Sequence, residues 1–187
     1  MSEIRIPVHT RTIRMDAARV SDTELEVCGQ LVDERAEPED WFGVPSELRI
    51  HDMRVTVRVR HPDLVVTAAS AAMARHPYTI CPDAVEPLGR LVGLSVAQGF
   101  TRAVNERLGR SRGCAHLTAL VHALAPVVRQ AAGVAFRGTR PAPDPEHDRW
   151  FVNTCQAWRE DGPLHSRLVA NDLEGLRNLT AWPRPRG

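Results

Sequence analysis

The chain has 187 residues, of which 43% are hydrophobic and 25% charged, so its composition is that of a folded domain and excludes disorder throughout. The net charge of +1 at pH 7 lacks the basic excess of a general nucleic-acid-binding protein, and we expect no nucleic-acid partner. No apolar run approaches the ~20 residues of a membrane helix, and the N-terminus lacks the apolar core of a secretory signal. We therefore expect a cytoplasmic protein without a membrane partner.

The first part of the chain predicts a small antiparallel sheet. Residues 1–22 are expected to be irregular, whereas the apolar and polar positions of residues 24–33 alternate as in a half-buried strand. Residues 34–48 contain glycine and prolines and predict a loop. The clearest alternation, residues 53–59, predicts a second strand. A His-Pro-Asp turn then leads to a third strand over residues 64–69, which forms a hairpin with the second.

The remainder of the chain predicts helices. Their expected ranges are residues 68–75, 82–94, 98–108, 115–132 and 168–179. Pro126 lies inside the longest of them and predicts a kink. Residues 150–158 fit a strand as well as a helix.

Strands followed by helices indicate an α+β fold. We expect a single α+β domain over residues 1–187, in which about three antiparallel strands pack against helices. Its core covers about residues 24–135. A polar, proline-rich linker follows at 137–148, and a C-terminal extension covers 149–187.

The basic residues exclude several classes of enzyme, because all 24 of them are arginine and the sequence contains no lysine. Without lysine there is no Schiff-base nucleophile and no lysine for a phosphate-binding loop. Lysine-dependent aldolases, pyridoxal-phosphate enzymes and P-loop NTPases are therefore excluded.

Three short segments place metal-ligand side chains at the ends of predicted elements. His51 lies just before the second strand, Cys81 precedes a predicted helix, and Cys114 and His116 lie at the start of the longest helix. Thiolate and imidazole are preferred ligands of zinc and also suit iron. We expect these four residues to hold one divalent transition metal, with zinc as the first candidate and iron as the second. Each segment taken alone also fits ordinary packing or capping.

Two further residues are candidates for catalysis beside this site. Asp52 adjoins His51 and could orient a histidine or act as an acid or base. Tyr78, the only tyrosine, precedes Cys81 by three residues and could donate a proton. The simpler explanations are surface exposure or capping for Asp52 and packing for Tyr78. The four cysteines include no CxxC pair, so we expect no disulfide.

The motifs at these positions resemble an uncharacterised bacterial domain family. The resemblance rests on HDM at residues 51–53, PYTICP at 77–82 and GCAHL at 113–117. It covers about residues 11–130, and again a short stretch near residues 155–158. A more distant resemblance links residues 50–135 to iron–sulfur assembly scaffolds of the IscU and SufU type. That resemblance implies a similar core, with metal-binding roles for His51, Cys81, Cys114 and His116. The sequence departs from the scaffolds at Arg49, where they carry a cysteine.

From these residues we expect a metal-dependent enzyme, using zinc or iron, that acts on a small organic molecule. A homo-oligomer is compatible with the sequence. Two alternatives stay open. One is a scaffold that accepts sulfur or an iron–sulfur cluster on a reactive thiolate. The other is a protein in which zinc has only a structural role.

Overall fold

The computed structural model describes residues 4–41, 43–136 and 152–181. By their internal contacts the residues of the chain form two compact units, residues 1–137 and 138–187, and each is described by itself. The first unit contains the sheet and the long helix. The predicted linker, residues 137–148, lies outside the described residues.

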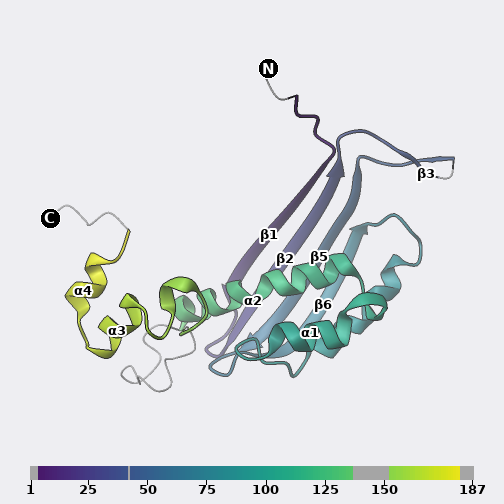
Figure 1. Ribbon diagram of the computed structural model, residues 1–187. Helices are drawn as coiled ribbons and strands as arrows, with labels where there is room; N and C mark the ends of the chain where they lie inside the picture. The colour runs from purple at the N-terminus through teal and green to yellow at the C-terminus, as the bar shows by residue number, and fades with distance from the viewer. Residues whose placement is uncertain (1–3, 42, 137–151, 182–187) are drawn as a thin grey trace. The chain divides into compact units, whose positions relative to one another are not determined.

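The first unit is built on a four-stranded antiparallel sheet (Figure 1). The strands follow one another in chain order across the sheet: β1 (His9–Arg19), β2 (Glu24–Arg35), β5 (Arg49–Arg60) and β6 (Val65–Arg75). In the central strands β2 and β5 every second residue is buried, so one face of the sheet carries the core. A small hairpin, β3 (Asp40–Trp41) with β4 (Val44–Pro45), lies within the predicted loop.

The fold class is confirmed as α+β with an antiparallel sheet, but the sheet has four main strands instead of about three. The irregular structure expected for residues 1–22 is wrong for residues 9–19, because β1 is an edge strand whose exposed residues leave little alternation of buried and exposed positions. The helix expected at 68–75 is also wrong. That alanine-rich segment continues β6, since pairing with β5 outweighs the weak strand propensity of alanine.

Helices cover one face of the sheet (Figure 1). The long helix α2 (Ala115–Ala135) contacts β1, β2 and β5, and α1 (Phe100–Leu108) packs against α2. The single helix expected at 82–94 is replaced by two 3₁₀ turns, η1 (Cys81–Ala84) and η2 (Glu86–Leu91). The reason is Pro87, which has no N–H to continue a helix that begins at Pro82. A third turn, η3 (Arg110–Arg112), precedes α2.

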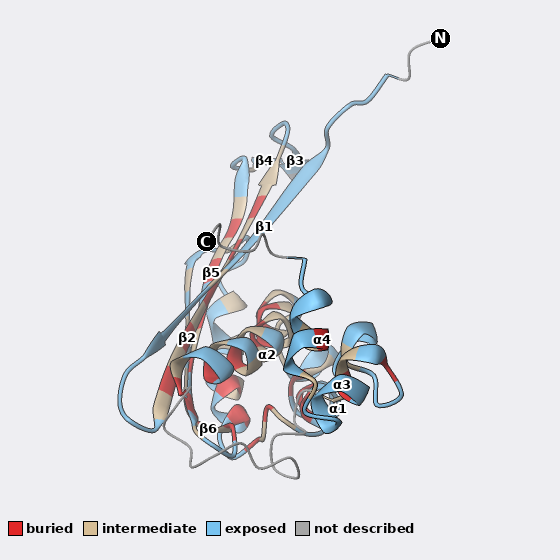
Figure 2. Ribbon diagram, turned by 90° about the vertical axis from the view of Figure 1, so that its left-hand side faces the viewer, coloured by how far each residue is buried: buried red, intermediate tan, exposed pale blue. Residues whose placement is uncertain are grey.

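The core lies between α2 and the sheet, where buried residues follow one face of the helix and one face of the strands (Figure 2). Leu120 of α2 is fully buried above β2. Gly29 of β2 leaves room for this packing, because a Cβ at that position would lie 2.7 Å from Met15 Sδ and 3.3 Å from Leu120 Cδ2. The helix continues through Pro126, so the proline does not end it.

By length and composition α2 could cross a membrane, since it has 21 residues and its most apolar stretch has a mean hydropathy of 1.3. Its buried leucines and valines nevertheless pack on the sheet, as in the core helix of a soluble domain. This arrangement is compatible with the expected cytoplasmic location, which stays a prediction.

The described part of the second unit contains the turn η5 (Gln156–Trp158) and two short helices, α3 (Pro163–Val169) and α4 (Leu173–Asn178). One helix was expected over residues 168–179. The chain instead breaks at Asn171, whose φ of 53° is left-handed, and the carboxylate of Asp172 then caps α4 by accepting the Gly175 N–H at 2.7 Å. The sequence left open whether residues 150–158 form a strand or a helix; residues 156–158 of this range form the 3₁₀ turn η5.

Candidate metal centre

The site begins with three residues that lie side by side across the sheet. Arg11 of β1 pairs in register with Asp33 of β2, and Asp33 pairs with His51 of β5. Asp33 continues the row Leu25, Val27, Leu31 on the core face of β2, so the alternation of the strand places its carboxylate under the helix layer. At this end of the sheet the buried row therefore changes from apolar to charged.

Asp33 is fully buried, and three side chains converge on its two oxygens. Arg11 donates from Nε to Oδ1 at 2.7 Å and from Nη2 to Oδ2 at 2.8 Å. His51 Nδ1 lies 2.9 Å from Oδ2, and His9 Nε2 lies 3.3 Å from Oδ1. Burial by itself raises the pKa of Asp33, but the hydrogen bonds with Arg11 and His51 outweigh it and lower the pKa to about 2. The carboxylate is therefore ionised at neutral pH.

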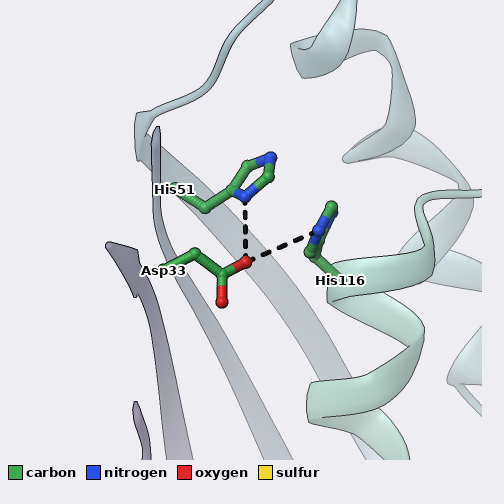
Figure 3. Close-up of side chains that lie close together, drawn as sticks. All are labelled: Asp33, His51 and His116. Atoms are coloured by element: carbon green, nitrogen blue, oxygen red, sulfur yellow. Dashed lines mark hydrogen bonds and ion pairs between the residues drawn. The ribbon is translucent and has the colours of Figure 1, made fainter. Parts of the chain in front are cut away.

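His116 reaches the same carboxylate from the first turn of α2 (Figure 3). Its Nε2 lies 3.6 Å from Asp33 Oδ2, and the rings of His51 and His116 have centroids 3.8 Å apart. One donor atom from each of Asp33, His51 and His116 lies within 4.8 Å of the others, which is close enough for one ion to bind all three. We call these three residues the Asp-His-His group.

The protonation of His51 suits a ligand role. Burial lowers the pKa of His51, and the attraction of Asp33 only partly offsets this effect. His51 is therefore neutral at pH 7, which is the form of imidazole that binds metals.

Cys114 lies beside the Asp-His-His group without belonging to it. It is the N-terminal cap residue of α2, and its Sγ lies 3.7 Å from His116 Nδ1. Burial raises the pKa of the Cys114 thiol. The contact with His116 and the backbone N–H groups of Leu117 and His116 outweigh burial, so the net pKa is lowered. The sulfur thus contacts the ring nitrogen of His116 that is turned away from Asp33.

The other residues predicted for the site lie apart from the group. Cys81 is half-buried in η1, and among the described residues it belongs to no cluster of metal-ligand side chains. Asp52 follows His51 in β5, so its side chain points to the opposite face of the sheet, where it accepts a hydrogen bond from Gln30 Nε2 at 2.7 Å. Tyr78 is exposed, and it lines the cavity beside the group.

That cavity has a volume of about 640 Å³ and is open to solvent. His51 and His116 both form part of its wall, and Tyr78 contributes another part. A volume of this size accommodates a small organic ligand. The Asp-His-His group therefore lies where a bound ion could meet such a ligand.

Sequence reasoning identified His51 and His116 but missed Asp33, Arg11 and His9. The signal for Asp33 was present, because the alternation of β2 assigns residue 33 to the same face as Leu25 and Leu31. An acidic residue at a position that the pattern assigns to the core needs a charged partner, and that requirement marks a site candidate. Arg11 and His9 were missed because β1 itself was not expected.

Comparison with known proteins identifies a family of unknown function. No curated protein and no solved structure matches the chain. The comparisons thus give no support to the resemblance to iron–sulfur scaffold proteins. The family described as "Protein of unknown function (DUF2889)" matches residues 9–130, a range that includes every residue of the Asp-His-His group as well as Arg11 and Cys114. The chain therefore belongs to the DUF2889 family.

Proposed function

We propose that this protein binds one divalent transition metal through Asp33, His51 and His116 and that it is a metal-dependent enzyme acting on a small organic molecule. The observation that carries the proposal is the approach of three donor atoms to within 4.8 Å of one another at the wall of a 640 Å³ cavity. Zinc is the first candidate and iron the second, because two imidazoles and one carboxylate suit either metal.

The donor set favours a catalytic site over a structural one. Structural zinc sites have four protein ligands, whereas catalytic sites commonly have three and leave a position for water or substrate. Among the residues that the structure describes, three form the group, and Cys81, which could have closed a four-ligand site, does not belong to it. A bound metal would supply Lewis-acid chemistry, polarising a carbonyl or lowering the pKa of a bound water.

Neighbouring residues of the chain hold the donors in place. The two hydrogen bonds from Arg11 fix the plane of the Asp33 carboxylate and keep it ionised. Cys114 contacts His116 Nδ1, which leaves Nε2 of that ring facing Asp33. Partners of this kind orient metal ligands in many proteins, and their loss weakens metal binding without abolishing it.

Metal content tests the proposal. Protein purified without chelator should contain about one equivalent of zinc or iron by elemental analysis, and His51→Ala and His116→Ala should each lose it. His122→Ala is the matched control, because His122 lies on the same helix and bonds Asn105 instead of the group. Circular dichroism establishes that each variant is folded. A metal-free wild type that takes up no added zinc or iron would contradict the proposal, as would variants that keep full occupancy.

A second candidate function rests on Cys114. Its thiol has a lowered pKa and contacts His116, whose other ring nitrogen faces Asp33, so the three residues form a chain in the order of a cysteine–histidine–aspartate nucleophile. In that function Cys114 accepts sulfur as a non-enzymatic scaffold protein does. A persulfide on Cys114, formed by a cysteine desulfurase in metal-free protein and absent from Cys81, would favour it. Full metal occupancy without sulfur uptake would exclude it.

A further inference from the structure

We propose that the cavity beside the Asp-His-His group binds a small monocarboxylate with an apolar body, and that Arg75 is the residue that binds the carboxylate. The inference rests on the proposed function, because it takes this cavity to be the substrate site. It adds the chemical class of the substrate and the residue that selects it.

The charge of the cavity wall favours an anion. Three arginines line the cavity, Arg35, Arg49 and Arg75, whereas Glu47 is the one acidic residue in the lining. Asp33 adds no net negative charge nearby, because the guanidinium of Arg11 is paired with its carboxylate. A metal ion in the Asp-His-His group would add further positive charge. Fields of one sign in a cleft concentrate ligands of the opposite sign.

Arg35 and Arg49 are already held by acidic residues outside the cavity lining. Arg49 donates from Nε and Nη2 to Glu34 Oε1, at 3.1 and 2.9 Å. Arg35 Nη1 lies 3.0 Å from a carboxylate oxygen of Glu39. These arginines therefore contribute charge to the wall, while each guanidinium group is already paired with a carboxylate; Arg35 Nη1 also donates to Ser46 Oγ in the lining at 3.2 Å.

Arg75 is held differently, because its partner is the acidic residue of the cavity lining. Its Nη1 donates to Glu47 Oε1 at 3.2 Å, and within the described residues this is its one side-chain hydrogen bond. Both side chains are more than half exposed, and exposed pairs of this kind contribute little to stability. The carboxylate of a ligand can therefore replace that of Glu47 and bind both arms of the guanidinium, a geometry that arginine favours.

The remainder of the wall suits an apolar body carrying one negative charge. Val44, Pro45, Ile50 and Pro77 supply apolar surface, and Tyr78 supplies an aromatic ring. One exchangeable arginine matches one negative charge, so a monocarboxylate fits better than a phosphate ester, which carries more charge. Benzoate is a suitable probe because it combines a carboxylate with an apolar ring. Benzamide has nearly the same shape without the charge.

The experiment is a calorimetric titration of the full chain with benzoate and with benzamide. We expect benzoate to bind about ten-fold more tightly than benzamide, as one charge-assisted hydrogen-bonded pair implies. Arg75→Gln should remove that preference, and Glu47→Gln should strengthen benzoate binding because it removes the competing carboxylate. Arg58→Gln is the matched control, since Arg58 forms a comparably exposed pair with Glu26 and does not line the cavity. It should bind both probes like the wild type.

The titrations are carried out with zinc-loaded protein and with protein dialysed against chelator. Equal affinity for the two probes in the zinc-loaded wild type would overturn the inference. A preference for benzoate that survives Arg75→Gln would also overturn it, because Arg75 would then not bind the carboxylate. So would a preference that is lost when the metal is removed, because the carboxylate would then bind the ion and not Arg75. Tighter binding of phenyl phosphate than of benzoate would overturn the choice of a carboxylate. Failure of the proposed function is distinguishable, because it appears as absence of metal and not as a change in probe preference.

Discussion

Replacing Asp33 by asparagine tests whether the buried carboxylate is stabilised by its partners. Asparagine keeps the shape of the side chain but removes the charge that Arg11 and His51 stabilise, and its amide N–H₂ cannot accept a hydrogen bond from Arg11. We expect Asp33→Asn to fold with lower stability. Metal should be absent throughout the measurement, because a ligand that binds the folded chain adds its own stabilisation.

The magnitude follows from the pKa of Asp33. The pKa falls from its ordinary value of 3.8 to about 2 in the folded chain, and each pKa unit corresponds to roughly 1.4 kcal/mol. Asp33→Asn should therefore lower the free energy of unfolding at pH 7 by about 2 kcal/mol. For a chain of this length that is a fall in Tm of roughly 4–8 °C.

The pH dependence has a definite sign. Because the pKa of Asp33 is lower in the folded chain than in the unfolded chain, the unfolded chain binds the proton first as the pH falls. The stabilisation is complete above about pH 4 and is lost as the pH falls toward 2. The difference between wild type and Asp33→Asn should therefore shrink over that interval.

Urea denaturation followed by circular dichroism in the presence of chelator measures this difference at each pH. Asp16→Asn is the control, because Asp16 lies on the neighbouring strand β1 and its ion pair with Arg14 is exposed. It should leave the free energy of unfolding unchanged within error. If Asp33→Asn is as stable as the wild type at pH 7, or if its deficit is the same at pH 7 and pH 2, the electrostatic account of Asp33 is refuted.

Three further predictions concern the core and the cysteines. Leu120→Ala should lower the free energy of unfolding by about 2–5 kcal/mol, because Leu120 is fully buried between α2 and β2, and a loss below about 1 kcal/mol in urea denaturation would contradict this packing. Cys81→Ala should keep its metal, whereas Cys114→Ala should bind it about ten-fold more weakly through loss of the contact with His116, as chelator competition would measure. Mass measurement under denaturing, non-reducing conditions should find four free thiols, and a mass lower by two hydrogens would reveal a disulfide.

The strands that sequence predicts well are those whose two faces differ in burial. In β2 and β5 every second residue is buried, and that alternation is visible in the sequence from Leu25 and from Met53. The edge strands β1 and β6 show less of this contrast. β1 is exposed along nearly its whole length, and β6 becomes rich in alanine after its first residues. β1 and the later part of β6 therefore depend on pairing with a neighbour that the local sequence does not reveal.

The candidate site was predictable from the sequence only in part. His51 and His116 lie at the beginning of regular elements, where sequence indicates that side chains can point into a shared space, and the structure brings them together. Cys81 satisfied the same criterion but lies in a 3₁₀ turn outside the group, because ligand type and position at an element end do not determine distance. The alternation of β2 assigns Asp33 to the core face, but its meeting with His51 and His116 depends on tertiary contacts that the sequence does not show.

The most direct test of the central claim is anomalous X-ray diffraction from crystals of the wild-type protein grown with zinc. The account predicts one strong anomalous peak per chain, about 2.0–2.2 Å from a donor atom of each of Asp33, His51 and His116. A peak bound instead by Cys81, or no peak among these three side chains in zinc-containing crystals, would contradict it.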